Sequence, residues 1–183
     1  MSELFFGVQL GIRSKPGDPW RSQVVDLVRL HQKDLGLADQ RGLFGALANL
    51  LTQGVDRATV GTWDLVPNGQ GTWNEWTTGL EDDAQERWVS DHSGAALDHV
   101  LVTVAMLMPD GQPAADVLRE VCDLEEAQFH ERTTYRSLCE ALARLPWTSV
   151  RRAGVYLTPG SEDLAFSLRE LQGDGYDYLA EIT

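Results

Sequence analysis

The chain has 183 residues, of which 43% are hydrophobic and 23% charged, and its net charge at pH 7 is −13. This length and balance predict a single soluble domain over residues 1–183, large enough to fold without disulfides. The negative charge disfavours binding to nucleic acid and to anionic lipid, because both attract basic surfaces. The apolar runs are too short for a membrane span and the first residues do not resemble a signal peptide, so we expect a cytoplasmic protein without membrane insertion.

The first half of the chain predicts a strand, two helices and a second strand. The apolar stretch 5–12 has the character of a strand. Asp18 is a suitable N-cap for a helix that starts at Pro19, where the missing N–H costs nothing. A leucine-rich second helix is predicted from 39 to 54, followed by a moderately polar strand over 60–66.

A Trp-rich segment, at about residues 67–94, is predicted to be an insertion between the two halves. Its stretch PNGQGTWNEW is rich in turn-forming residues and is read as a turn, not as a phosphate-binding loop. Thr78 and Glu81 fit a capping box, which predicts a short helix that runs through Trp88.

The second half repeats the order of the first. The stretch 99–108 is the strongest strand, and it is apolar on both faces. Helices are predicted over 113–124 and up to Leu145, and a last strand over 149–158. The C-terminal extension has no clear pattern.

This element order favours an α+β fold of the ferredoxin-like kind, a split βαβ sandwich. The first and third strands would be central, and the second and fourth, which carry charges, would be edges. Helices would cover one face of the sheet. Because the strand at 99–108 is apolar on both sides, a second layer must cover the opposite face. The Trp-rich insertion, the C-terminal segment and a second subunit are the candidates.

Several stretches resemble the domain of unknown function 1517 family, which is found in cyanobacteria and plastids. The resemblance rests on FFGVQLGI, LADQRGLFGALANLL, ERWVSD, HVLVTVAMLMPDG and VYLTPG, with YDYL in an acidic tail. Members carry a glycine-rich stretch and a membrane segment that this chain does not show. The resemblance implies a fold and no catalytic residues, since none is established for the family.

Possible reactive groups are few. Asp91, His92, Asp98 and His99 are weak candidates for a metal site, because ligand spacings such as HExxH are missing. Asp91, His92 and Ser93 are the residue types of a hydrolytic triad, but adjacent residues rarely face one another as a triad requires. Glu126 and His130 lie four residues apart, a spacing that places both on one face of a helix. For each group the simpler interpretation is a solvated or structural side chain.

The favoured hypothesis is a non-catalytic interaction module that binds another protein or its own copy through a sheet face or the Trp-rich insertion. The alternative is a small-molecule sensor whose pocket is walled by tryptophans. A hydrolase or metal enzyme is the third hypothesis, and no cofactor is predicted. The residues proposed for binding are Trp63, Trp73, Trp76, Trp88, Arg151 and Arg152.

Overall fold

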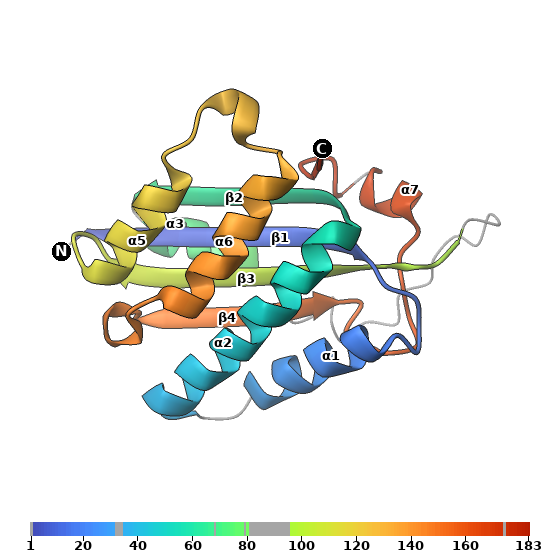
Figure 1. Cartoon of the computed structure of the whole chain (residues 1–183), viewed down its shortest axis with the longest axis horizontal. Helices are drawn as coiled ribbons and strands as arrows, with labels where there is room; N and C mark the ends of the chain where they lie inside the picture. The colour runs from blue at the N-terminus through green and yellow to red at the C-terminus, as the bar shows by residue number, and fades with distance from the viewer. Residues whose placement is uncertain (1, 32–34, 68, 79, 81–95, 174) are drawn as a thin grey trace.

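The computed structural model describes residues 2–31, 35–67, 69–78, 80, 96–173 and 175–183. These residues form an α+β fold around a five-stranded antiparallel sheet of order β4-β3-β1-β2-β5 (Figure 1). The strands are β1 (Glu3–Arg13), β2 (Ala58–Pro67), β3 (His99–Pro109), β4 (Arg152–Thr158) and β5 (Ala180–Glu181). The α-helices are α1 (Pro19–His31), α2 (Leu37–Gly54), α3 (Gly69–Thr77), α5 (Pro113–Cys122), α6 (Arg132–Arg144) and α7 (Leu168–Leu171).

The predicted strands and long helices are all present. The Asp18 carboxylate accepts a hydrogen bond from the Trp20 backbone N–H at the start of α1, as an N-cap does. Pro113 is the first residue of α5, and the helical turn η1 (Val55–Arg57) follows directly on α2. Among the described helices, none is long and apolar enough to cross a membrane.

The predicted central strands are central, but the split βαβ connection is not what the structure has. In a split βαβ unit, a third strand lies between two parallel strands. Here β1 pairs directly with β2, and β3 with β4, and both pairs are antiparallel. The reason is the number of connecting helices. One connecting helix returns the chain to the end of the sheet where the first strand began, so the next strand runs parallel to the first. Two consecutive helices return it to the end where the first strand finished, so the next strand runs antiparallel.

The main core lies between one face of the sheet and four helices. Figure 1 shows α1, α2, α5 and α6 on this face. Every second residue of β1 points into this core, as the alternation of a strand requires. The buried side chains from the two central strands include Leu4, Phe6, Val8, Leu10, Val100, Val102, Val104 and Met106.

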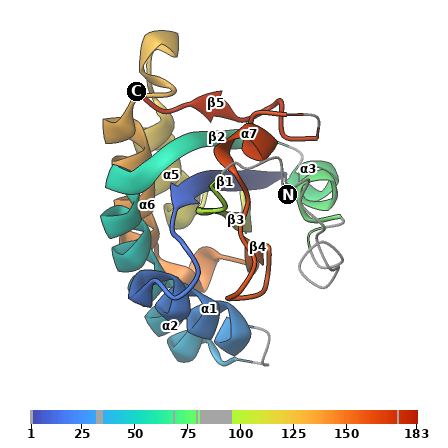
Figure 2. The ribbon, with the colours of Figure 1, turned by 90° about the vertical axis from the view of Figure 1, so that its right-hand side faces the viewer.

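The opposite face of the sheet is covered by the chain itself. Figure 2 shows α3 and the segment that contains α7 on this side. The C-terminal segment packs Phe166 and Leu171 against Leu101, and α3 packs Trp73 against Phe5 and Leu107. All residues of β3 except the last are therefore buried. The prediction that two layers cover this strand is confirmed, and both layers are supplied from within the chain.

The first part of the Trp-rich segment is a helix, and the prediction of a turn there was wrong. Gly69 begins α3 and is buried against the backbone of β1. A Cβ atom on Gly69 would lie 2.5 Å from Leu107 Cδ1 and 2.7 Å from the backbone N of Phe5. The glycine therefore permits a close approach between helix and sheet. Residues 81–95, which hold most of the helix predicted through Trp88, lie outside the described residues.

Replacing Gly69 by alanine is expected to lower the free energy of unfolding by about 1–3 kcal/mol, the usual cost of overpacking a filled interior. The backbone of β1 cannot move aside for the added methyl group, so α3 must shift. Gly71 is the matched control, because it lies on the same helix with no neighbouring atom within 4 Å of an added Cβ. Gly71→Ala should stabilise by about 0.5–1 kcal/mol through helix propensity. Urea denaturation of both variants measures these changes in the free energy of unfolding. Equal changes in the two variants would contradict the close packing of α3 on the sheet.

Candidate functional site

A cavity of about 550 Å³ opens on the second face of the sheet. It lies over β1 and β2, between α3 on one side and the segment after α7 on the other. The chain positions that form it are distant in sequence and come from four separate segments. The lining residues are Gln9, Thr62, Asp64, Glu75, Trp76, Thr78, Leu80, Gly175, Tyr176 and Tyr178.

The floor of the cavity is polar, although most of this sheet face is apolar. Gln9 of β1 is buried and its Nε2 donates a hydrogen bond of 3.0 Å to Thr103 Oγ1. Thr62 and Asp64 come from β2, two residues apart, so both side chains point to the same side of the sheet. Thr62 pairs with Gln9 across the β1–β2 ladder, which places the three side chains together.

Asp64 and Trp76 are joined at the wall of the cavity. The Trp76 indole Nε1–H donates a hydrogen bond of 3.3 Å to Asp64 Oδ2. Burial raises the pKa of the Asp64 carboxyl above its ordinary value, and the hydrogen bond from Trp76 partly opposes this. The Trp76 ring also contacts Phe5, with ring centroids 5.3 Å apart, and lies over Gly7, where a Cβ would meet it at 2.7 Å.

The opposite wall is aromatic and comes from the C-terminal segment. Tyr176 packs edge to face on the buried Phe166, with centroids 5.4 Å apart, and its ring lies 6.4 Å from that of Tyr178. Leu171 and Leu179, on either side of these tyrosines, are buried against the sheet. The segment is therefore anchored at both ends, and its tyrosines are held at the cavity while Tyr178 stays half exposed.

Of the tryptophans predicted for binding that the structure describes, only Trp76 lines the cavity. Trp73 is buried between α3 and the sheet, where it packs against Phe5 and Leu107. Trp63 points to the other face of the sheet, where its Nε1 donates a hydrogen bond of 2.9 Å to the carbonyl of Phe129. Trp88 lies outside the described residues.

The two predicted arginines are engaged within the chain, away from the cavity. Arg151 Nη1 lies 2.6 Å from Glu3 Oε1 in an ion pair. The Arg152 guanidinium lies over the Trp73 ring, 4.9 Å from its centroid, in a cation–π contact. The two side chains thus connect the start of β4 to β1 and to α3.

The histidine candidates are not assembled into a catalytic or metal site by the described residues. His99 is buried and its Nδ1 lies 2.7 Å from Asp98 Oδ1, while Arg13 Nε donates to the other oxygen of Asp98. Burial lowers the pKa of His99 despite the opposing effect of Asp98, so the ring is neutral at pH 7. Within the described ranges, no three potential metal ligands converge. Asp91, His92 and Ser93 lie outside those ranges.

The Glu126–His130 pair and the two cysteines also have structural roles. Glu126 belongs to the short helical turn η2 (Glu126–Gln128), and His130 lies after its end, so the two residues do not share one face of a helix. His130 Nδ1 lies 3.5 Å from the Tyr135 hydroxyl. Burial raises the pKa of the Cys122 and Cys139 thiols to about 12, so neither is a thiolate nucleophile at neutral pH.

The floor and the C-terminal wall of the cavity were not predicted from the sequence. A signal for the floor was present: Gln9 is the one polar side chain within the apolar stretch 5–12. Thr62 and Asp64 give a second polar alternation on the neighbouring strand. Tyr176 and Tyr178 have the same spacing of two, but their position depends on a segment without periodicity.

Comparisons with known proteins identify no relative: no family model matches the chain, and searches of curated proteins and of solved structures find no match either. The resemblance to the domain of unknown function 1517 family therefore stays a prediction. The site is assigned from its geometry alone.

Proposed function

We propose that this chain is a binding domain for a small organic molecule, held in the cavity between α3 and the C-terminal segment. The observation that carries the proposal is the convergence of Gln9, Asp64 and Trp76 on a hollow of about 550 Å³. Ligand pockets in proteins commonly have volumes of roughly 300–1,000 Å³, with apolar walls and a few placed polar groups. The cavity has this size and this distribution of polar and aromatic side chains.

The cost of the polar floor supports a ligand-binding role. Burying polar groups lowers stability unless they are hydrogen-bonded, and burying a carboxylate costs more. The rest of this sheet face is filled by Phe5, Leu101 and Leu107, so apolar residues would fit there. A half-buried carboxyl at this place is typical of a functional position, since natural sequences break local packing rules mainly at such sites.

The second face of the sheet is not open to a protein partner in the way that the sequence suggested. Association through a sheet face was motivated by the doubly apolar strand 99–108. Because α3 and the C-terminal segment cover the second face, that motivation is removed. The hypothesis of a small-molecule pocket walled by tryptophan is supported instead, because Trp76 lines the cavity.

Tryptophan fluorescence tests this proposal. A panel of small metabolites that raises the melting temperature should also change the intrinsic fluorescence, because Trp76 lines the cavity. Trp76→Phe should abolish the fluorescence response, whereas Trp63→Phe should keep it, since Trp63 lies on the other sheet face. A response that disappears in Trp63→Phe and persists in Trp76→Phe would place the ligand elsewhere.

A variant that fills the cavity gives an independent check. Thr62→Phe adds a ring to the floor, and we expect it to fold, since Thr62 is half-buried on a strand where aromatic residues are favoured. Ligands that stabilise the natural chain should no longer stabilise this variant. Unchanged binding by Thr62→Phe, or a panel in which no compound binds the natural chain, would contradict the proposal.

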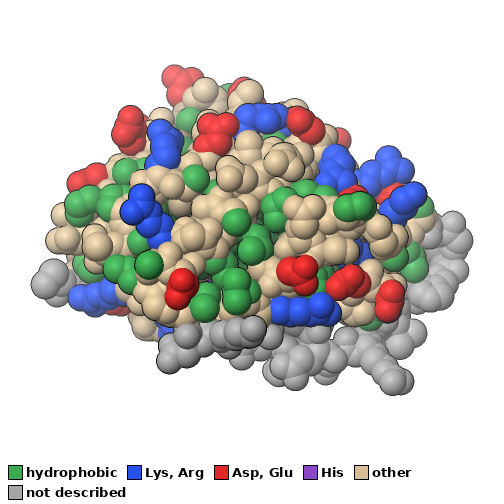
Figure 3. Space-filling view, turned by 60° about the horizontal axis from the view of Figure 1, so that its bottom comes forward, with side chains coloured by type: hydrophobic (Ala, Val, Ile, Leu, Met, Phe, Trp, Pro, Cys, Tyr) green, Lys and Arg blue, Asp and Glu red, His purple; other side chains and the backbone are tan. Residues whose placement is uncertain are grey.

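Protein association is the second candidate function. Viewed from the lower edge of the molecule in Figure 1, hydrophobic side chains gather in one part of the surface, with acidic and basic groups around them (Figure 3). Leu30 at the end of α1 and Leu37 at the start of α2 are large hydrophobic residues that stay exposed. Light scattering over a range of concentrations tests this candidate, and a mass that stays monomeric at high concentration would exclude self-association.

A further inference from the structure

We propose that the cavity selects an organic cation, such as a primary or quaternary ammonium, over neutral and anionic molecules of the same shape. This inference rests on the proposed function, because it names the chemistry of the ligand in the same cavity. Three independent features support it: the charge of the lining side chains, the aromatic walls, and the contact between a carboxylate and an indole.

Among the lining residues that the structure describes, the two charged side chains are both acidic. Asp64 and Glu75 contribute carboxylates, and none of the other described lining residues is a lysine, arginine or histidine. Glu75 is exposed at the rim, and Asp64 is half-buried on the floor. Because the whole chain carries a net charge of −13, its field also attracts cations toward this opening. An anionic ligand would meet repulsion at the rim and on the floor.

The walls present aromatic rings to the cavity. Trp76 lies on one side, and Tyr176 and Tyr178 on the other. A cation near the face of an aromatic ring is attracted by the negative face of the ring, most strongly by tryptophan, and quaternary ammonium groups are recognised by aromatic cages in this way. The rings also supply apolar contact to the methyl or methylene groups that surround the nitrogen.

The contact between Asp64 and Trp76 places both attractions in one spot. The indole Nε1–H donates to Asp64 Oδ2, so the carboxylate lies at the edge of the ring. A cation above the Nε1 side of the ring would therefore also lie close to the carboxylate. Burial already raises the pKa of Asp64, which means that its charged form lacks full solvation, and an ammonium would supply the missing stabilisation. A neutral ligand would leave the carboxylate uncompensated.

A metal ion is a poorer fit than an organic cation. Hard divalent ions prefer six or more oxygen ligands, and no cluster of three potential metal ligands occurs among the described residues. The cavity has far more room than one metal ion needs, and much of its wall is aromatic. Its shape therefore suits a group of several carbon atoms around a charge.

Isothermal titration with choline and its uncharged carbon analogue, in which a quaternary carbon replaces the nitrogen, tests the inference. The two probes share size and shape and differ in charge. Choline should bind at least about tenfold more tightly, since a difference of 1.4 kcal/mol is tenfold and the aromatic and carboxylate contacts together exceed it. Asp64→Asn should weaken this preference, because the floor carboxylate is lost while the aromatic rings and Glu75 remain. Asp116→Asn, an equal charge change at an exposed position of α5, should leave it unchanged.

The pH dependence gives a second readout. Only the ionised carboxylate attracts the cation, so choline affinity should fall as the pH is lowered from neutral toward the raised pKa of Asp64. In Asp64→Asn this dependence should be smaller, because Glu75 is then the one carboxylate left among the described lining residues. Binding of the uncharged analogue should change little with pH in either protein.

The possible failures are distinguishable. If the uncharged analogue or a carboxylic acid of similar shape binds as tightly as choline, the selection of cations is refuted and the cavity stays a binding site. If choline does not bind while other compounds of the metabolite panel do, the inference is likewise refuted. If neither choline nor any compound of the panel binds, the proposed function itself is refuted.

Discussion

Replacing Phe166 by alanine is expected to lower the free energy of unfolding by about 3–5 kcal/mol, the usual cost of truncating a fully buried phenylalanine. Phe166 fixes the C-terminal segment to the second face of the sheet. Its ring packs against Leu101 and Leu171, and its backbone exchanges hydrogen bonds of 2.8 and 2.9 Å with His99. The truncation leaves a hole where this segment meets β3.

Equilibrium urea denaturation measures the effect, with Phe129→Ala as the control. Phe129 is partly exposed and contacts Trp63 edge to face on the other side of the sheet. Its removal should cost only about 0.5–1.5 kcal/mol, the size of one aromatic pair contact. If the two alanine variants were equally stable, the C-terminal segment would not cover the sheet as described, and the cavity would lose one of its walls.

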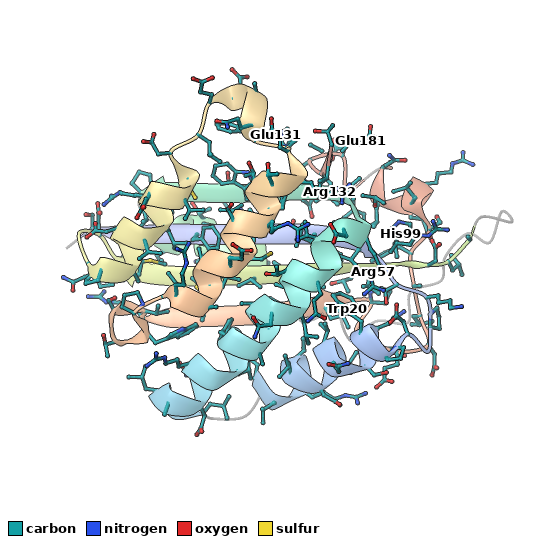
Figure 4. All side chains as sticks on the ribbon, in the orientation of Figure 1. Trp20, Arg57, His99, Glu131, Arg132 and Glu181 are labelled. Carbon is teal, nitrogen blue, oxygen red and sulfur yellow. The ribbon has the colours of Figure 1, made fainter. Side chains whose placement is uncertain are left out.

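Arg132→Ala is expected to cost about 2–4 kcal/mol, because one guanidinium holds three separate parts of the chain together. Arg132 begins α6 and donates hydrogen bonds to the carbonyls of Val55 and Ala58 and, at 3.5 Å, to that of Ile182 (Figure 4). Its backbone N–H also donates to the carbonyl of Thr183. Without this side chain, the carbonyls of Val55, Ala58 and Ile182 lose a charged hydrogen-bond donor.

Arg136, one turn further along α6, is the matched control. It makes a single ion pair with Asp56, with 2.6 Å between Nη2 and Oδ1, and both side chains are exposed. Exposed ion pairs typically contribute about 0–1 kcal/mol, so Arg136→Ala should have little effect. Arg132→Lys should recover only part of the loss, since an ammonium cannot reproduce the fork of the guanidinium. Equal stability of the two alanine variants would contradict the described clamp.

The strands were predictable because their hydrophobic patterns depend on burial alone. The stretch 99–108 is apolar on both faces, and the structure gives it neighbours on both sides and cover on both faces. The stretches 60–66 and 149–158 carry polar residues and were predicted to be edges. This was right for β4 and wrong for β2, because the short strand β5 pairs with its outer side. The apolar pattern of a strand therefore indicates how far its two faces are buried.

The order of connection was not predictable in the same way. Both halves contain two helices between their strands, and this count decides whether the second strand returns parallel or antiparallel. The ferredoxin-like prediction treated each helical pair as one crossover. The short strand β5 was missed because it has only two residues, whose pairing with Val60 and Gly61 depends on how the C-terminus is held.

The cavity depends on contacts between segments far apart in sequence, so only part of it could be anticipated. Trp76 was named because tryptophans are concentrated between the two halves. Gly69 and Gly71 suggested a turn, but Gly69 permits close packing of a helix. Asp64 gave no local signal of its burial, which comes from α3 lying above it. Tyr176 reaches the cavity only because Phe166 anchors its segment.

The most direct test of a ligand site at this cavity is a two-dimensional NMR spectrum of the indole N–H groups during a titration with choline. The chain has six tryptophans, and each gives its own indole signal. The indole signal of Trp76 should shift progressively, because its N–H donates to Asp64 at the binding site, while those of Trp63 and Trp73 should stay in place. A spectrum in which Trp76 is unaffected while choline binds would contradict the account.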